Sequence, residues 1–368
     1  MPDGWSWPFR CSSCGREYPR EALPFRCAVC GGHYDLADPL RYAPIPVPGL
    51  ERYRNSFPLP PGARLLSLGE GGTPLVGQEI EGKRVFFKCE YLNPTGSFKD
   101  RGTAVLISAL AAAQVREAIE DSSGNAGASF AAYAARAGIR AKVFMPDSAS
   151  GPKRAQIEAY GAEVVSILGP RSEAAQAVVR AAEAGSVYAS HAYMPQILAG
   201  MATFAFELVE QLGRAPGALL LPVGQGTLLL GAYLGFQALA RQKLIHQLPQ
   251  LIGVQARACA PLWAVHEAGM AGLGWVQEGQ TLAEGIRILN PLRGDAVLAA
   301  VDATQGGVEV VEESEIPAGR RALAERGFFV EPTSAVVWSA LLRRLPDLPE
   351  PIVAVLTGSG YKSAWNGA

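Results

Sequence analysis

The chain has 368 residues, of which 49% are hydrophobic and 18% are charged, and its 33 basic and 34 acidic side chains nearly cancel. This length favours two or three domains, and the apolar fraction excludes an intrinsically disordered chain. The balanced charge predicts no general affinity for nucleic acid or for an anionic membrane, and no run of about 18 apolar residues predicts a membrane span. The first residues, MPDGWSWPFRCSSC, lack the basic end and the apolar run of a signal peptide, so we expect a cytoplasmic protein.

Residues 1–40 are expected to form a zinc ribbon. Four of the six cysteines follow the spacing C-x2-C-x12-C-x2-C, and these are Cys11, Cys14, Cys27 and Cys30. In a reduced cytosol this spacing indicates a metal rather than disulfides. Four thiolates complete the tetrahedral coordination of zinc, so the ion would be structural. A ribbon without metal and a ribbon that binds nucleic acid remain as alternatives.

After a proline-rich segment at 39–61, expected to be an extended linker, the chain alternates between short apolar strands and amphipathic helices. The strands are predicted at 84–90, 117–121, 141–146, 163–168, 186–190, 218–224, 250–256 and 352–357. The helices are predicted at 98–113, 125–137, 152–160, 171–184, 196–212, 226–242, 317–326 and 333–344. This alternation is typical of an α/β fold with parallel sheets covered by helices on both faces, and the chain is long enough for two such sheets.

Ligands of such folds bind at the carboxyl ends of the strands, where three loops rich in glycine and serine follow predicted strands, at 121–129, 222–231 and 356–362. Unpaired amides at a helix start attract an anion, so the loop at 224–228 suits a phosphate. Leu229 stands where a dinucleotide fingerprint requires glycine, which argues against NAD. The loop DSSGNAGAS suits a carboxylate, although a plain strand–helix turn is the alternative for every loop.

Lys99 lies in NPTGSFKDRG, where a helix is predicted to begin. A lysine at the positive end of a helix dipole is favoured as the neutral amine, and a neutral amine forms a Schiff base with an aldehyde. One lysine alone does not identify a reactive amine, because most lysines are solvated surface residues.

Several motifs occur in order along the chain: NPTGSFKDRG, SSGNAGASFAAYAARAG, the glycine-rich loop at 224, AEGIRILNP, EPTSA and TGSGYK. Together they resemble fold type II pyridoxal-phosphate enzymes, specifically the threonine synthase family, which often carries an N-terminal zinc ribbon. The resemblance covers about residues 10 to 362.

The resemblance implies roles for individual residues. Lys99 would form the Schiff base with pyridoxal 5′-phosphate and then move protons. Asn125 would bond the cofactor's 3-hydroxyl, and Thr357, with Ser359 as the fallback, would face the pyridine nitrogen. Backbone amides would cradle the cofactor phosphate at Gly224, Gln225, Gly226, Thr227 and Leu228. The carboxylate of an amino-acid substrate would be held by Ser122, Ser123, Gly124 and Ala126.

The family fold has two doubly wound parallel-sheet lobes with the cofactor between them. By resemblance, residues 90–195 would form the small lobe. Residues 196–368 would form the large lobe together with 41–89, which contain the linker. The family also suggests a homodimer.

The family reaction converts O-phosphohomoserine to L-threonine and phosphate, and here the chain departs from the family pattern. In the stretch HAYMPQILAGMAT, His191 stands for an asparagine, Ala192 for a serine, Ile197 for an arginine and Ala202 for a lysine. Each charged hydrogen bond to a phosphate contributes about 1.5–3 kcal/mol, so affinity for a phosphorylated substrate is expected to fall.

The alternative is therefore a paralogue that carries out β-elimination or replacement on serine, threonine or an activated serine, as a dehydratase or a cysteate or cysteine synthase does. On that alternative Ile197→Arg is expected to improve the use of O-phosphohomoserine. His191 would be a substrate contact or an acid–base group, or simply a hydrogen-bonded histidine at a strand end. A catalytically inactive homologue and a binding module carried by the ribbon are the remaining hypotheses.

Overall fold

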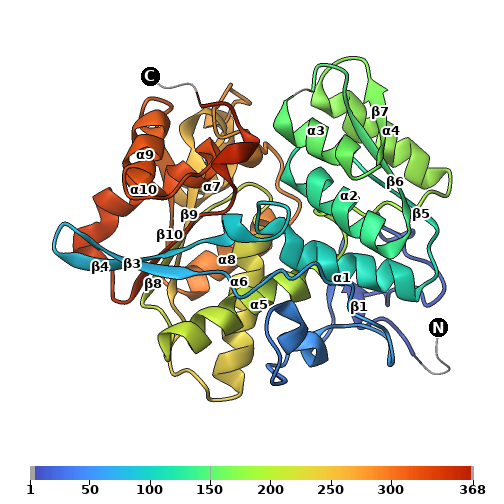
Figure 1. Ribbon diagram of the computed structural model, residues 1–368, viewed down its shortest axis with the longest axis horizontal. Helices are drawn as coiled ribbons and strands as arrows, with labels where there is room; N and C mark the ends of the chain where they lie inside the picture. Colours follow the sequence, from blue (N-terminus) through green and yellow to red (C-terminus); the bar gives the residue numbers. More distant parts are fainter. Residues whose placement is uncertain (1–4, 150, 366–368) are drawn as a thin grey trace. The chain divides into compact units, whose positions relative to one another are not determined.

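Residues 5–149 and 151–365 are described by the computed structural model, and their contacts divide the chain into two units (Figure 1). The first unit is Met1–Gly71 with Lys99–Met201, and the second is Gly72–Phe98 with Ala202–Ala368. Within the described ranges, no helix combines the length and the apolar character that a membrane crossing needs.

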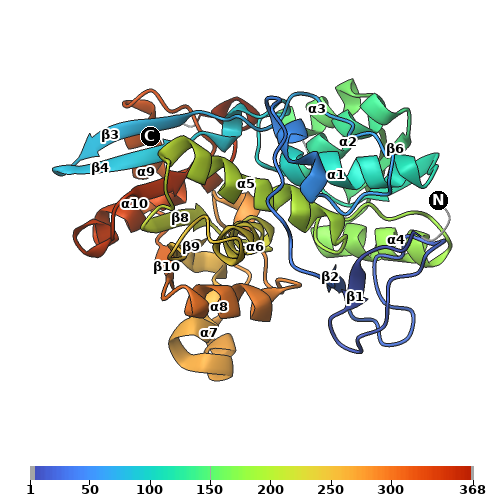
Figure 2. The same cartoon turned by 90° about the horizontal axis from the view of Figure 1, so that it is seen from below.

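The first unit is built on a three-stranded parallel sheet in the order β5-β6-β7. The strands are β5 (Glu117–Glu120), β6 (Arg140–Pro146) and β7 (Glu163–Ile167). The helices are α1 (Lys99–Ala112), α2 (Asn125–Ala137), α3 (Pro152–Ala159) and α4 (Arg171–Glu183). Both α2 and α4 pack against β6, from opposite sides of the sheet (Figure 2). The loop between β5 and α2, residues 121–124, therefore lies at the carboxyl end of this parallel sheet.

The predicted strand at 186–190 is the one predicted strand that the structure replaces with a single bridge. Tyr188 pairs in parallel with Ile119 of β5, and Ala189 N–H donates to the Ile119 carbonyl at 2.8 Å. The chain then turns at once, because the Ser190 hydroxyl accepts the amides of Ala192 and Tyr193 at 3.3 Å each. The turn ends the pairing and leaves His191 beside the carboxyl end of β5.

The cysteine-bearing segment forms its own small core within the first unit. Its strands β1 (Phe9–Cys11) and β2 (Tyr34–Leu36) pair antiparallel. Tyr18 contacts Tyr34 edge to face, with ring centroids 4.6 Å apart, and the cluster also includes Ala109 of α1. The segment is therefore held against α1 by apolar contacts.

The second unit contains a six-stranded sheet in the order β10-β9-β8-β11-β4-β3. Its pairings are parallel except that β3 runs antiparallel to β4 at the edge. The strands are β3 (Leu75–Ile80), β4 (Lys83–Lys88), β8 (Ala218–Pro222), β9 (Gln250–Ala256), β10 (Gly307–Val311) and β11 (Ile352–Val355). Every residue of β8 and β11 is buried, as expected for central strands of a sheet covered by helices.

Six helices complete this part of the chain. They are α5 (Gln196–Leu212), which crosses the boundary between the units, α6 (Thr227–Arg241), α7 (Pro261–Ala268), α8 (Gly294–Ala303), α9 (Glu315–Ala324) and α10 (Pro332–Arg344). Helix α10 packs across β8, β9, β10 and β11, and α6 and α8 pack together and against β9. The predicted α/β fold class is confirmed, with a purely parallel three-stranded sheet and a six-stranded sheet that is mixed.

Candidate active site

Lys99 begins α1 directly after a segment that is anchored at several backbone positions. Phe98 N–H donates to the Thr357 carbonyl at 3.0 Å, and Ser97 forms a bridge with Gly358. The buried Lys362 ammonium donates to the Thr95 carbonyl at 2.7 Å. These bonds fix the residues before Lys99, so its half-buried side chain starts from a defined backbone position.

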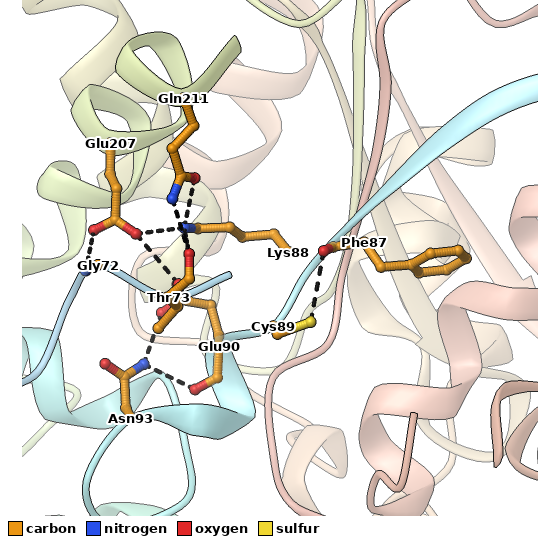
Figure 3. Close-up of polar contacts among 9 residues, drawn as sticks. All are labelled: Gly72, Thr73, Phe87, Lys88, Cys89, Glu90, Asn93, Glu207 and Gln211. Atoms are coloured by element: carbon orange, nitrogen blue, oxygen red, sulfur yellow. Dashed lines mark hydrogen bonds and ion pairs between the residues drawn. The ribbon is translucent and has the colours of Figure 1, made fainter. Parts of the chain in front are cut away.

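A buried polar network supports the start of the same segment (Figure 3). The Lys88 ammonium donates to the Thr73 carbonyl at 2.6 Å, to the Gln211 side chain at 2.9 Å and to the Glu207 carboxylate. Its three protons are thus matched by three acceptors. Because Lys88 is fully buried and paired, it serves as a structural cation.

The network continues from Glu207 to the loop that leads to Lys99. Thr73 Oγ1 donates to Glu90 Oε1 at 2.7 Å and lies 3.3 Å from Glu207 Oε1. Asn93 Nδ2 donates to Glu90 Oε2 at 3.0 Å and to the Glu90 carbonyl at 2.8 Å (Figure 3). Such a connected network makes its members mutually rigid, and here it fixes the first residue of NPTGSFKDRG.

Ser97 carries a functional group that the sequence analysis missed. Its side chain is fully buried, and its hydroxyl has no hydrogen-bond partner among the residues that the structure describes. A buried hydroxyl without a partner is costly, which indicates that a bound group satisfies it. Its position two residues before Lys99 is the only signal for this role in the sequence.

The loop 224–228 presents backbone to a ligand because its glycines have no room for side chains. A Cβ on Gly226, where φ is +77°, would overlap Cγ2 of Val297, and one on Gly224 would lie 3.0 Å from Cα of Ile286. Gln225 turns its side chain away to accept the Leu292 amide at 3.0 Å. Helix α6 begins at Thr227, so the amides of Thr227 and Leu228 lack intrahelical acceptors. The loop thus offers amides at a helix start and no charged side chain.

Thr357 follows β11, is buried, and meets Ser334 of α10, which the sequence analysis did not single out. The two hydroxyl oxygens are 3.1 Å apart, and Ser334 Oγ accepts the Gly358 amide at 2.8 Å. The single proton of Ser334 can go to the Gly358 carbonyl, at 3.1 Å, or to Thr357, and in the second case the Thr357 proton is left for a ligand acceptor. Ser359, the fallback, is engaged locally: its Oγ accepts the Tyr361 amide at 3.3 Å.

In the first unit, the loop between β5 and α2 partly satisfies its own amides. The Ser122 amide donates to the Glu120 carboxylate, and the Gly124 amide donates to Ser122 Oγ at 3.2 Å. The loop also carries the hydroxyl protons of Ser122 and Ser123 and the Ala126 amide, which lies in the first turn of α2. Together they remain suited to a carboxylate.

Glu120 is the residue of this region that sequence reasoning missed, and it ties His191 to the loop. Its buried carboxylate lies 2.7 Å from His191 Nδ1 through Oε1, while Oε2 receives the Ser122 amide. Burial is the largest influence and raises the pKa of Glu120, but the hydrogen bond and charge of His191, the Ser122 amide and the charge of Arg171 together outweigh it and leave that pKa below its ordinary value. The sequence signal that could have identified Glu120 is an acidic residue at the end of a predicted strand, directly before the 121–129 loop.

The residues at the positions expected to carry cations, Ile197 and Ala202, are apolar and buried. Ile197 is buried, and a Cβ on Gly102 would lie 2.6 Å from its Cγ2, so its side chain packs on the backbone of α1. Ala202 is fully buried. Neither side chain can donate a hydrogen bond to a phosphate or pair with its charge.

These observations fit pyridoxal phosphate when each unit is considered by itself. In the second unit, the amides at 224–228 suit the phosphate, the Thr357 hydroxyl suits a pyridine nitrogen, and Ser97 is a buried hydroxyl in need of a partner. In the first unit, Lys99 offers an amine at a helix start. Among the described residues at these positions, no charged side chain opposes a bound phosphate.

The four ribbon cysteines converge, as their spacing predicts. Their sulfurs all lie within 4.8 Å of one another, with Cys14 and Cys27 3.8 Å apart and Cys11 and Cys30 3.4 Å apart. Sulfurs of a tetrahedral zinc site with Zn–S of about 2.3 Å are about 3.8 Å apart. Backbone N–H groups of Cys30 and Val29 lower the pKa of the Cys27 thiol to about 6, which favours the thiolate that a metal binds.

Comparison with known proteins places the chain among related sequences and structures. The family described as pyridoxal-phosphate dependent enzyme matches residues 66–358. The threonine synthase of Synechocystis sp. is 37% identical over 85% of this chain and 82% of that protein. The threonine synthase of Methanosarcina acetivorans is 31% identical over 95% of this chain and 90% of that protein.

Solved structures agree on the fold. A threonine deaminase of T.th. superposes with a TM-score of 0.66 and 30% identity, over 80% of this chain and 94% of that one. A maize serine racemase superposes with a TM-score of 0.68 over 78% of this chain and 88% of that one, and its 24% identity supports the fold alone.

Proposed function

This chain belongs to the family of pyridoxal-phosphate-dependent enzymes and is a threonine-synthase-like lyase, and from that premise we propose that it converts O-phosphohomoserine to L-threonine and phosphate. The observation that carries the proposal is the anchored segment before Lys99, whose Phe98 amide is bonded to the carbonyl of Thr357. That bond fixes the backbone directly before the residue whose amine begins helix α1.

The proposed cofactor residues each use a group described above. Lys99 holds pyridoxal phosphate covalently through its ε-amine, and Asn125 bonds its 3-hydroxyl. The amides from Gly224 to Leu228 hold the phosphate, and Thr357, or Ser359 in its place, faces the pyridine nitrogen. When bound, the cofactor supplies an electron sink for a carbanion at the substrate's α-carbon.

The protein itself supplies binding and proton transfer. The hydroxyls of Ser122 and Ser123 and the amides near Gly124 and Ala126 hold the substrate carboxylate, which orients the reacting carbons. The ε-nitrogen of Lys99 takes and returns protons at those carbons. His191 contacts the rest of the substrate.

A second candidate, the β-elimination or replacement paralogue, is favoured by one specific observation. Ile197 and Ala202, at the positions expected to carry cations for a substrate phosphate, are buried. Serine, threonine or an activated serine places no dianion in the site and needs no such cations.

A substrate panel separates the two candidates. The holoenzyme is incubated with O-phosphohomoserine, serine, threonine and O-acetylserine, and threonine, phosphate and 2-oxo acids are quantified. Threonine and phosphate in equal amounts support the first candidate, and 2-oxo acid from an unphosphorylated substrate supports the second. Release of neither from any substrate would refute both.

The remaining proposals concern the whole chain. We propose a structural zinc ion on Cys11, Cys14, Cys27 and Cys30, a cytoplasmic location and a homodimer. We also retain the division into a ribbon at 1–40, a small lobe at 90–195 and a large lobe at 196–368 completed by 41–89.

A further inference from the structure

His191 and Glu120 form a hydrogen-bonded pair at the carboxyl end of β5. His191 lies where β5 ends, and Glu120 is the last residue of that strand. A ring nitrogen of His191 and carboxylate oxygens of Glu120 and Asp121 all lie within 4.8 Å of one another. The same Glu120 carboxylate receives the Ser122 amide, so one side chain orients both the imidazole and the loop proposed to hold the substrate carboxylate.

The contact with Glu120 settles which nitrogen of the imidazole faces outward. Nδ1 lies 2.7 Å from Glu120 Oε1, and the side chain of His191 is 16% exposed. A carboxylate accepts, so Nδ1 carries the proton and Nε2 is the nitrogen left for a ligand. No described residue forms a hydrogen bond with Nε2. In the imidazolium Nε2 carries a proton as well, and this Nε2–H is the group that can act as an acid.

The neighbouring carboxyls of Glu120 and Asp121 have different partners and opposite pKa shifts. Tyr188 donates its hydroxyl to Asp121 Oδ1 at 2.7 Å, and Arg171 donates to Asp121 Oδ2 at 3.3 Å. Burial and the neighbouring Glu120 raise the pKa of Asp121, whereas the pKa of Glu120 lies below its ordinary value. Glu120 is thus the carboxyl of the two that favours the charged form.

Both candidate reactions need a proton at the leaving oxygen. Hydroxide leaves from serine or threonine and the phosphate trianion leaves from O-phosphohomoserine, and each is a poor leaving group until it is protonated. The family's arginine position is Ile197, which is buried and apolar. Within the first unit, His191 is the residue beside the 121–124 loop that can both attract a negative leaving group and give it a proton.

We propose that His191, oriented by Glu120, is the acid that protonates the leaving oxygen of the substrate side chain, an inference that rests on the proposed function. A C–H bond on the carbon adjacent to the one that bears the leaving group gives its proton to the Lys99 amine and its electron pair to a new C=C bond between these two carbons. The C–O bond breaks with its pair going to oxygen, and the Nε2–H proton passes to that oxygen. The imidazole is left neutral and regains its proton from water.

The test compares leaving groups that need a proton with one that does not. Serine is paired with β-chloro-L-alanine, and O-phosphohomoserine with L-2-amino-4-chlorobutyrate, because chloride leaves without protonation. In the holoenzyme, His191→Gln should lower kcat for the oxygen substrate by about 100-fold or more, the usual contribution of a general acid, and kcat for the matched chloride by less than about threefold. His266→Gln is the control, because His266 also faces a carboxylate, Asp302 at 3.8 Å, and should change neither rate.

If His191→Gln lowers kcat equally for both members of a pair, or does not lower kcat for the oxygen substrate, the proposal is overturned. A wild-type holoenzyme that turns over none of the four compounds would refute the proposed function instead. A second measurement then still decides the inference, because it needs no turnover. The chain has four histidines, so ¹⁵N-histidine NMR resolves the ring nitrogens, and the signal lost in His191→Gln identifies His191.

We expect Nδ1 of His191 to be protonated in the wild type. We also expect Glu120→Gln, which removes the charge of the positioning residue, to lower kcat for each oxygen substrate about tenfold more than kcat for its matched chloride. A bare Nδ1 in the wild-type spectrum would contradict the assigned arrangement whatever the kinetics show.

Discussion

Lys88 and Lys99 show how surroundings decide what a lysine does. Lys88 is fully buried with three acceptors around its ammonium, so it is held as a structural cation. Lys99 starts a helix, where the dipole disfavours the charged form, and it follows a segment whose backbone is fixed by Thr357 and Gly358. We therefore propose Lys99, and not Lys88, as the amine that reacts with an aldehyde.

Ile197→Arg tests whether the lost arginine can simply be restored. Sequence position alone predicts better use of O-phosphohomoserine, but the burial of Ile197 against Gly102 changes that expectation. An unpaired guanidinium there should lower the free energy of unfolding by about 3 kcal/mol or more, without faster phosphate release. Ile197→Met introduces a long side chain without a charge, and it should lower the free energy of unfolding by less than about 1.5 kcal/mol.

Urea denaturation gives the two stabilities, and phosphate release from O-phosphohomoserine gives the activity. A stable Ile197→Arg protein that releases phosphate faster than wild type would contradict this account, because it would show that the position opens onto the substrate.

At the residue scale, the sequence predicts which local motifs carry chemistry but not which distant side chains meet. Lys99 and the cysteine quartet are predictable because each depends on nearby residues. The partnership of Glu120 with His191 and that of Ser334 with Thr357 are not, since each requires knowing which strand or helix lies beside which.

Helix α2 is the element whose two ends test the candidate site most cleanly, because both carry a glycine for different reasons. A Cβ on Gly127, in the first turn, would overlap the Ser122 carbonyl oxygen. Gly138, which caps the other end, has a φ of +66° and open space around it. One glycine allows the loop to lie against the helix, and the other allows a left-handed turn.

Gly127→Ala should therefore displace the backbone of the 122–124 loop and weaken its hold on the substrate carboxylate. We expect a loss of about 1–3 kcal/mol in stability, as for overpacking, and a KM raised about tenfold or more for whichever substrate is active. The matched control, Gly138→Ala, should lose about 1–2 kcal/mol from left-handed strain with KM unchanged. Thermal unfolding and steady-state kinetics measure both. An unchanged KM in Gly127→Ala would remove the loop from the substrate site.

At the element scale, the sequence predicts most of the long helices and buried strands but misses several elements in the second half of the chain. Helix α9 begins at Glu315, two residues before the predicted 317, because Pro317 is tolerated inside a first turn. The segment 186–190 is a single bridge because Ser190 turns the chain. Helices α7 and α8 and strand β10 were not predicted: the glycine-rich stretch around 269–275, which forms a 3-10 helix, interrupts the periodicity there.

Over the whole molecule, the six cysteines divide by environment as they do by sequence. Cys11, Cys14, Cys27 and Cys30 converge, whereas Cys89 and Cys259 are buried elsewhere. Burial raises the pKa of the Cys89 thiol to about 11 and also raises that of Cys259. An unfolded cysteine ionises near pH 8.5. The stability that comes from keeping the Cys89 proton is therefore present below about pH 8.5 and is lost as pH rises towards 11.

Thiol titration with Ellman's reagent at pH 8 tests the four converging cysteines and the two buried cysteines in one experiment. We expect the zinc-loaded protein to show almost no reactive thiols, a chelator to release four, and denaturant to release all six. Zinc in the chelator fraction is quantified in parallel. Four reactive thiols before chelation would contradict the metal site, and six after chelation alone would contradict the burial of Cys89 and Cys259.

The central claim is the covalent bond between Lys99 and pyridoxal phosphate, and borohydride reduction followed by peptide mapping tests it most directly. The purified protein is loaded with the cofactor, reduced, digested and sequenced by mass spectrometry, with Lys99→Ala treated in the same way. We predict a pyridoxyl group on Lys99, none on the buried Lys88, and none in the Lys99→Ala protein. A label on any other lysine, or no label on the wild-type protein, would contradict the account.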